Sequence, residues 1–225
     1  MRLFIAAMAM IVAPACGFAQ MIDPVAVSPE KYKVLLENDH VRVVQYTINP
    51  GESDKVHEHP AKVSYVVSGG TLRISSRDTS FVSEEHAGDT YAMGAVQPHS
   101  AANIGKTPVT IILFELKRID AQEVPLAEDP FANNPKTLTV KLENDSVRVM
   151  EAVIPPAWKE TQHTHPPYAM YILNGGSVRM HFTDGTARDV QFNTGEARFS
   201  DKVTHWAENT GADTVKVVLV EMRHR

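Results

Sequence analysis

Residues 36–43 read LENDHVRV and residues 142–149 read LENDSVRV, so seven of eight positions are identical at a spacing of 106. The same spacing joins further pairs: His57 with His163, His59 with His165, Pro60 with Pro166, Gly69 with Gly175, Gly70 with Gly176, His99 with His205, and Asn103 with Asn209. A sequence repeat of fixed length indicates that the chain contains the same structural unit more than once. The sequence therefore predicts a tandem duplication.

Each copy is predicted to be a small β-barrel. Stretches such as 41–48 (VRVVQYTI) and 168–173 (YAMYIL) are short, rich in β-branched and aromatic residues, and separated by Gly, Asn, Asp or Pro. Many short strands in about 90 residues are typical of a sandwich or a closed barrel. We therefore expect an all-β chain with barrels at 20–118 and 137–225, joined by an acidic, aperiodic linker at 119–136.

Composition places the chain among globular proteins and narrows its partners. Of 225 residues, 43% are hydrophobic and 22% charged, which excludes global disorder and a polytopic membrane protein. The net charge of −5 argues against nucleic-acid binding through a broad basic face. A small-molecule substrate or ligand is the expected partner, and formation of a homo-oligomer is left open.

The N-terminus resembles an export signal. Residues 1–19 carry Arg2, an apolar run and the sequence Gly-Phe-Ala before a cleavage point after Ala19. The run is shorter than the roughly 20 residues that span a bilayer, so the mature protein is expected to be periplasmic or secreted, without a membrane span. Lipidation at Cys16 is the alternative. Either way, no cysteine beyond residue 16 is available as a metal ligand.

Three histidines in each copy predict a metal site. Side chains alternate along a strand, so His57 and His59 face the same way, as do His163 and His165. Such a pair with one distant histidine, His99 or His205, would bind a divalent transition metal and leave coordination positions open. A lone His-x-His is more often a surface or core feature, but here all three histidines recur in register.

These residues resemble the motifs of the cupin superfamily. Gly51, His57-x-His59 and Gly70 resemble the first cupin motif, and Gly88 through His99 to Asn103 resembles the second. The second copy repeats them with His163-x-His165 to Gly176 and Gly195 through His205 to Asn209. The resemblance covers residues 31–223 and implies a bicupin, with a double-stranded β-helix, or jelly roll, in each half. It also implies a metal inside each barrel, held by the three histidines.

The chain departs from the cupin pattern in one chemically important way. The family's usual fourth ligand is a glutamate shortly after His-x-His, but residues 60–64 and 166–170 contain no carboxylate. Three neutral imidazoles leave the full +2 charge on the metal, which favours an anionic ligand. This set resembles that of cupin dioxygenases acting on β-diketones or thiols, which bind iron. Members that degrade oxalate use the glutamate and are ranked lower.

Five further residues are candidates for orienting a metal ligand or lining a pocket: Asn103, Asn209, Tyr65, Tyr171 and Trp206. The asparagines would orient a ligand or end their strands, and the aromatic residues would line a pocket or pack in the core. Arg42 and Arg148 are expected to point outward from half-buried strands. The more aromatic second copy is favoured for chemistry.

The sequence thus favours an exported metal-dependent oxidoreductase, dioxygenase-like, acting on a small organic anion. Iron is the metal expected first, with copper, nickel, manganese and zinc as alternatives. Two other functions stay open: a non-catalytic cupin that binds a small ligand or metal, and a metal-dependent isomerase or lyase acting on sugar acids. Individual catalytic residues are not assigned from sequence.

Overall fold

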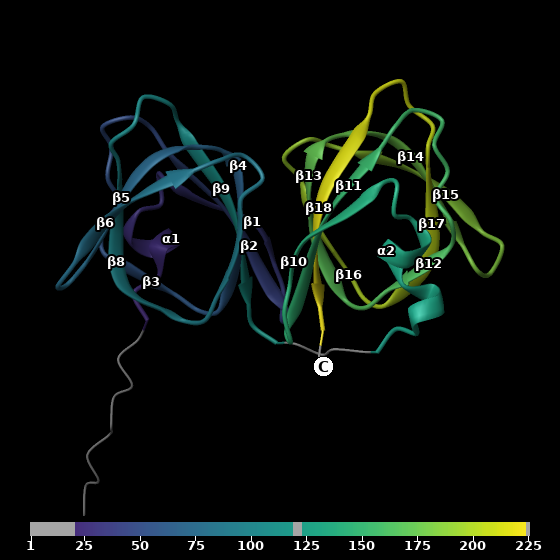
Figure 1. Cartoon of the computed structure of the whole chain (residues 1–225), viewed down its shortest axis with the longest axis horizontal. Helices are drawn as coiled ribbons and strands as arrows, with labels where there is room; N and C mark the ends of the chain where they lie inside the picture. Colours follow the sequence, from purple (N-terminus) through teal and green to yellow (C-terminus); the bar gives the residue numbers. More distant parts are fainter. Residues whose placement is uncertain (1–20, 119–122, 224–225) are drawn as a thin grey trace, which may run out of the picture.

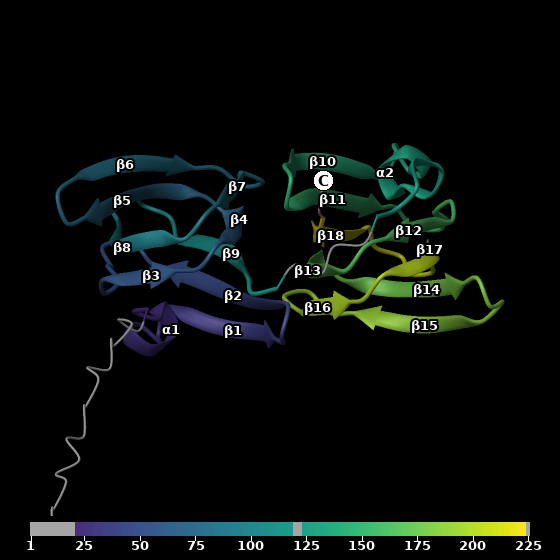
Figure 2. The ribbon, with the colours of Figure 1, turned by 90° about the horizontal axis from the view of Figure 1, so that it is seen from below.

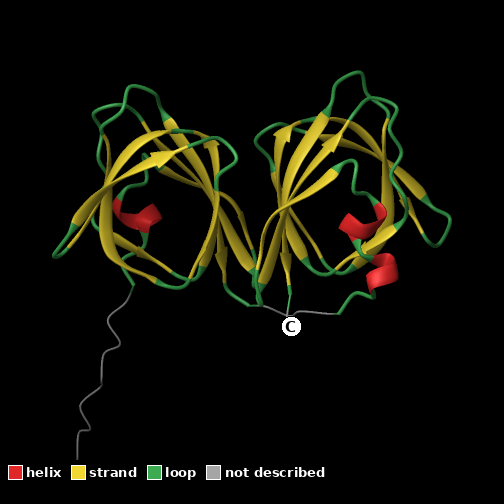
Figure 3. Cartoon of the chain, viewed as in Figure 1, coloured by secondary structure: helices red, strands yellow, loops and turns green. Residues whose placement is uncertain are grey.

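The computed structural model describes residues 21–118 and 123–223, which form two β-barrels side by side (Figures 1 and 3). The expected all-β fold with two tandem barrels is confirmed. The predicted export signal and Cys16 lie outside the described residues. No helix in the described ranges is long and apolar enough to cross a membrane.

The first barrel contains one short helix and nine strands. These are α1 (Pro24–Val27), β1 (Tyr32–Glu37), β2 (Val41–Ile48), β3 (His57–His59), β4 (Lys62–Ser68), β5 (Gly70–Ser76), β6 (Ser80–Glu85), β7 (Thr90–Met93), β8 (Val96–Asn103) and β9 (Val109–Leu116). They form a five-stranded sheet in the order β1-β2-β9-β4-β7 and a four-stranded sheet in the order β3-β8-β5-β6. All pairings are antiparallel, and the two sheets enclose the barrel interior (Figure 2).

The second barrel repeats this topology. Its elements are η1 (Leu126–Glu128), α2 (Pro130–Asn133), β10 (Leu138–Glu143), β11 (Val147–Ile154), β12 (His163–His165), β13 (Tyr168–Asn174), β14 (Gly176–Phe182), β15 (Ala187–Phe192), β16 (Ala197–Ser200), β17 (Val203–Asn209) and β18 (Val215–Met222). Its sheets run β10-β11-β18-β13-β16 and β12-β17-β14-β15, so each strand has a counterpart in the first barrel. The duplication read from sequence is a duplication of structure.

The repeat begins earlier than the sequence indicated. Helix α2 lies inside the expected linker 119–136, and it corresponds to α1 at the same spacing of 106. Both helices begin with proline after an aspartate N-cap, Asp23 or Asp129, whose side chain accepts a backbone N–H. The segment from Asp129 onward therefore belongs to the second barrel rather than to a linker.

The two five-stranded sheets pack against each other. One apolar cluster includes buried residues of both barrels, among them Val43 and Phe114 from the first and Val149 and Val220 from the second. The edges meet reciprocally, with β7 beside β10 and β1 beside β16 (Figure 2). The two barrels therefore share one hydrophobic core between their sheets.

Two local differences distinguish the copies. The turn that contains Gly51 at φ 80° contains Ala157 at φ 59° in the second copy, a left-handed conformation that side chains rarely adopt. Strand β8 has an irregular register between its pairings with His57 and His59, whereas β17 pairs regularly with β12. Over this stretch β8 has one residue more than β17, and it is accommodated as a bulge opposite the His-x-His strand.

Candidate metal centres

The structure brings the six predicted histidines together as two groups of three. His57, His59 and His99 form one group, and their ligand atoms all lie within 4.8 Å of one another. His163, His165 and His205 form the other by the same criterion. His99 is partly exposed, whereas every member of the second group is buried. Strand pairing explains the assembly, because His57 lies opposite His99 and His163 lies opposite His205.

Hydrogen bonds fix how the imidazoles of the first group are presented. The Nδ1 atom of His57 lies 2.7 Å from the Lys55 carbonyl oxygen, and that of His99 lies 2.9 Å from the Gln97 carbonyl oxygen. A carbonyl oxygen can only accept, so each Nδ1 carries the proton and donates. In the neutral rings the lone pair is therefore on Nε2. The second group follows the same rule at His163, whose Nδ1 lies 2.8 Å from the Thr161 carbonyl oxygen.

The Nε2 atoms converge in each barrel. Those of His57 and His59 are 3.1 Å apart, and those of His163 and His165 are 3.0 Å apart. Two neutral imidazoles in this arrangement direct lone pairs at each other, which a cation between them would relieve. Uncharged nitrogen donors in a set of three suit a divalent transition metal and leave positions for other ligands. The residues present therefore fit the predicted metal.

Burial lowers the pKa of two histidines in each group. Desolvation lowers the pKa of His59 to about 4, against the opposing effect of its hydrogen bond with Glu115. Desolvation and the neighbouring His165 lower the pKa of His163 to about 4 as well. The pKa values of His99 and His205 are also lowered, chiefly by burial. Neutral imidazole is the form that binds metal.

A buried carboxylate orients one histidine in each barrel. Glu115 accepts a hydrogen bond from His59 Nδ1 at 2.8 Å, and Glu221 accepts one from His165 Nδ1 at 2.7 Å. Burial alone would raise the pKa of Glu115, but its hydrogen bonds with His59 and Arg42 outweigh burial and lower it. An ionised carboxylate behind a ligand histidine fixes its tautomer and strengthens it as a donor.

The outward orientation expected for Arg42 and Arg148 is wrong. Arg42 donates to Glu115 and to Asp23, the N-cap of α1, and Arg148 repeats both contacts with Glu221 and Asp129. Arg42 lies on the same face of β2 as Val44 and Tyr46, which pack inside the first barrel. The alternate residues of this strand belong to the cluster between the barrels, so neither face of the strand is left to solvent. The resulting series of Asp, Arg, Glu and His occurs in both copies at a spacing of 106. The repeat in the sequence therefore contains a signal for this hydrogen-bonded series.

The first histidine group lines a cavity of about 460 Å³. Lys62 and Ser64 of β4 line it together with Tyr32, Tyr46 and an apolar wall. The Lys62 side chain is buried, and desolvation lowers its pKa to about 8, so the ammonium remains charged at neutral pH. This volume lies within the range of sites that hold drug-sized ligands.

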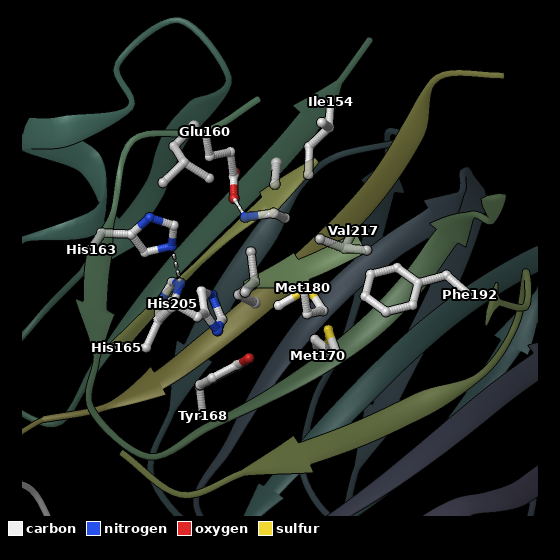
Figure 4. Close-up of a pocket in the computed structure, with 14 residues that line it drawn as sticks. Ile154, Glu160, His163, His165, Tyr168, Met170, Met180, Phe192, His205 and Val217 are labelled. Carbon is white, nitrogen blue, oxygen red and sulfur yellow. Dashed lines mark hydrogen bonds between the residues drawn. The ribbon is translucent and has the colours of Figure 1, made fainter. Parts of the chain in front are cut away.

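The second histidine group lines a much smaller space of about 50 Å³ (Figure 4). Figure 4 shows the three histidines close together, with Met170, Met180 and Phe192 filling the space beside them. Met170 replaces Ser64 of the first copy. Phe192 occupies the position of Glu85, because each of the two pairs with the first glycine of the neighbouring strand. The larger cavity is thus in the first barrel, contrary to the preference that sequence gave the second.

The other pocket candidates lie away from the two histidine groups. Asn103 ends β8, and its side chain donates to the backbone carbonyls of Ile48 and Thr107. Asn209 ends β17, and its side chain donates to those of Ile154 and Asp213. Tyr65 and Tyr171 belong to the apolar cluster between the barrels, and Tyr65 donates to Glu151 of the second barrel at 2.7 Å. Trp206 stacks on His181 at 5.1 Å.

Sequence reasoning missed several polar residues that line the first cavity or lie directly behind its wall. The Tyr32 hydroxyl donates to Asp54 at 2.9 Å, and the same oxygen lies 3.0 Å from His57 Nε2. Asp54 corresponds to Glu160 of the second barrel, where burial raises the pKa to about 7. The pair Asp54 and Glu160 follows the repeat and could have been found from it. Tyr32 and Lys62 could not, because Leu138 and Tyr168 replace them.

Comparison with solved structures finds the same fold in other proteins. A variant of Bacillus subtilis oxalate decarboxylase superposes with a TM-score of 0.62 and 14% identity, covering 85% of this chain and 72% of that one. The formate complex of Lactobacillus farciminis oxalate decarboxylase gives 0.59 and 15%, covering 84% and 78%. A further structure of the Bacillus subtilis enzyme, described for its Mn(II) centres, gives 0.61 and 14%, covering 93% and 78%.

No protein-family model matches the sequence, and no curated protein matches it significantly. At 14–15% identity the structural likeness concerns the fold. It confirms the fold of two tandem β-barrels that the motifs indicated. Each barrel of this chain carries one three-histidine group suited to a divalent metal.

Proposed function

We propose that this protein is a metal-dependent enzyme that acts on a small organic anion in its first barrel. The observation that carries the proposal is the cavity of about 460 Å³ lined by His57, His59 and His99. A substrate in this cavity would lie against the histidine group and a buried ammonium, that of Lys62. The corresponding space of about 50 Å³ in the second barrel is too small for an organic substrate, so we assign that barrel's metal a structural role.

We further propose that the reaction is an oxidation by dioxygen. When bound, the metal would supply open positions for substrate and dioxygen at a centre whose three protein ligands are neutral. The chain's own contribution is to position that centre. Hydrogen bonds to the Lys55 and Gln97 carbonyls and to Glu115 hold the three rings with Nε2 facing inward. The apolar part of the wall limits the access of water to the reacting groups.

The identity of the metal belongs to the same proposal. Iron is expected, and manganese is the main alternative because Mn(II) centres are described for Bacillus subtilis oxalate decarboxylase. Three imidazoles accept either ion. We also propose that residues 1–19 direct export of the protein. The identity of the bound metal would then depend on which metals are available where the exported protein folds.

The deciding experiment combines elemental analysis with oxygen consumption. The mature protein, purified without tag or chelator, is assayed on β-diketones, flavonols and small thiols. We expect close to two equivalents of a divalent transition metal and substrate-dependent oxygen uptake. Zinc alone, with no uptake after anaerobic iron loading, would contradict dioxygenation and favour a binding protein.

Paired variants locate the chemistry. Replacement of His57 and His59 by alanine should abolish turnover and remove one equivalent of metal. The matched change of His163 and His165 should remove the other equivalent and leave turnover measurable. Activity that survives only the first change would place the reaction in the second barrel and contradict the proposal.

Decarboxylation of a carboxylate is the second candidate, favoured by the likeness of the fold to two oxalate decarboxylases. The same assay separates the two reactions, because decarboxylation releases carbon dioxide without net oxygen uptake. Oxalate is therefore added to the substrate panel.

A further inference from the structure

We infer that the substrate of the first barrel is a monoanion with an apolar or aromatic body, and that Lys62 is the residue that recognises its charged end. This inference rests on the proposed function, since it names the substrate class of the same cavity. It depends on three features of that cavity: its buried cation, its apolar wall and its volume.

The cation is built into the wall. Lys62 is the first residue of β4, three positions after His59, and its side chain is only 6% exposed. Lys62 and Ser64 line the cavity, whereas Val63 and Tyr65 between and after them belong to the cluster between the barrels, as strand alternation requires. The ammonium is therefore directed to the side of the strand on which the histidines lie.

This ammonium has no protein partner at bonding distance. In the described parts of the chain Lys62 forms no hydrogen bond and no ion pair, although Glu115 and Asp54 lie near enough to act on it electrostatically. Glu115 is already engaged by His59 and Arg42, and Asp54 by Tyr32 and the Ala101 amide. A buried, unpaired charge is costly unless something satisfies it. An anionic group on a ligand at the histidine centre would do so.

Most of the remaining wall is apolar, and this apolar part extends to the surface. It includes Leu72, Ile74, Phe81, Met93, Ile111 and Leu113. Phe81 and Met93 are 57% and 40% exposed, so the apolar wall reaches the mouth of the cavity. An anion of two carbons would leave most of this surface without a partner. A ligand with an aromatic or branched apolar body would bury it.

A second negative charge on that body is disfavoured. Glu85 of β6 lines the same cavity, and its Oε2 is buried without a hydrogen-bond partner in the described residues. The cavity thus offers one cation for one anionic group and a carboxylate that would repel another. In the second barrel Tyr168 replaces Lys62 and Phe192 takes the place of Glu85, so these recognition features belong to the first barrel alone.

The test measures ligand binding to the zinc-loaded mature protein by calorimetry. Binding to the zinc form separates recognition of the ligand from turnover. The probes are 3-phenylpropionate, its neutral isostere 3-phenylpropanamide, and acetate and oxalate, which are anions without a body. We expect 3-phenylpropionate to bind at least about tenfold more tightly than each of the other three. Equal binding of the amide would overturn the role of the charge, and equal binding of acetate would overturn the role of the body.

Variants assign the recognition to residues. Lys62→Met should weaken binding of 3-phenylpropionate by about 10- to 100-fold, leave amide binding unchanged and leave zinc content at the wild-type value. Lys62→Arg should retain part of the affinity, and Lys106→Met, which removes an exposed lysine, should have no effect. Phe81→Ala should weaken 3-phenylpropionate several-fold without affecting acetate.

The outcomes distinguish this inference from the proposed function. Unchanged 3-phenylpropionate binding in Lys62→Met, with zinc retained, overturns the inference whatever the enzyme oxidises. Binding that depends on Lys62 but is accompanied by no oxygen uptake for any anion supports the inference and contradicts the dioxygenase. If Lys62→Met loses zinc, the four-ligand comparison on the wild-type protein still decides the charge and body requirements.

Discussion

His59 and His165 owe their orientation to residues far away in sequence. Glu115 and Glu221 lie 56 positions downstream, and each carboxylate bridges its histidine to an arginine. The histidine, carboxylate and arginine therefore act as one unit, in which a change at the carboxylate alters the histidine. Because each unit is confined to one barrel, the two sites can be perturbed separately.

We predict that Glu115→Gln weakens metal binding in the first barrel by about 10- to 100-fold. The amide oxygen can still accept from His59 Nδ1, but it no longer carries the charge that strengthens the ligand and pairs with Arg42. Competition with a chelator measures the effect as the loss of one equivalent at lower chelator concentration. Glu221→Gln is the matched control and should affect the other equivalent. Equal weakening of both sites by either variant would contradict the independence of the barrels.

The buried histidines also predict how stability depends on pH. The pKa values of His59 and His163 are about 4 in the folded chain, against 6.5 for a free histidine. Between these values the unfolded chain binds more protons, so the free energy of unfolding of the metal-free protein should fall as pH falls from about 6.5 towards 4. Urea denaturation at pH 7, 6 and 5 measures this slope. A double variant with asparagine at both positions should show a shallower slope, and a pH-independent wild type would refute the prediction.

How far these residues could be predicted depends on whether they repeat. The six histidines of the candidate metal centres could be found from sequence because they recur at one spacing and alternate correctly along a strand. Lys62 was not, because a lysine replaced by tyrosine in the other copy looks like an ordinary surface residue. Arg42 and Arg148 do recur, but the sequence could not show that both faces of their strands are covered, one inside its own barrel and one against the other barrel.

At the scale of secondary structure, α1 and α2 connect helix capping to the metal centres. Asp23 and Asp129 cap these helices and at the same time pair with Arg42 and Arg148. The two pairs differ in burial. The Asp129 and Arg148 side chains are 9% and 5% exposed, whereas those of Asp23 and Arg42 are 35% and 11% exposed. The same contact should therefore contribute differently in the two barrels.

We predict that Asp129→Asn lowers the free energy of unfolding by about 3 kcal/mol, because it leaves a buried guanidinium with one carboxylate fewer. Asp23→Asn, the matched change, should cost about 1 kcal/mol or less, because solvent screens that pair. Asparagine caps a helix about as well as aspartate, so both substitutions isolate the ion pair from the cap. Chemical denaturation at neutral pH gives the two values. Equal costs would mean that burial does not set the strength of these pairs.

Strand order was predictable as a class but not in its details. Strand-like texture and the cupin motifs indicated a jelly roll in each copy, and the four sheets agree. Helix α2 was missed inside the expected linker because four helical residues are too few to show a period. Cavity size was unpredictable for another reason: it depends on which side chains meet inside, such as Ser64 and Glu85 in one barrel and Met170 and Phe192 in the other.

At the scale of the whole molecule, the two barrels share one fold but differ in their interiors. Both barrels keep the histidines, the carboxylates behind them and the capped helix, yet only the first keeps a cavity of ligand size. The second is filled with apolar side chains and packs its five-stranded sheet against that of the first. A barrel with so little internal space is suited to stabilising its partner, which makes coupling between the barrels the property to test.

We predict that the barrels unfold as one unit, and that a cavity made on the first barrel's side of their shared core is felt in the second. Phe114 of β9 is fully buried in that core, so Phe114→Ala should cost about 3–5 kcal/mol. Both tryptophans, Trp158 and Trp206, lie in the second barrel, so their fluorescence reports unfolding there. The fluorescence midpoint should shift to lower denaturant together with the circular-dichroism midpoint, whereas Phe81→Ala, at a position 57% exposed, should move neither. The contrary result is an unchanged tryptophan midpoint in Phe114→Ala together with a circular-dichroism transition in two steps. It would show that the two barrels are independently stable, because each would then keep its structure without the face that it shares with the other.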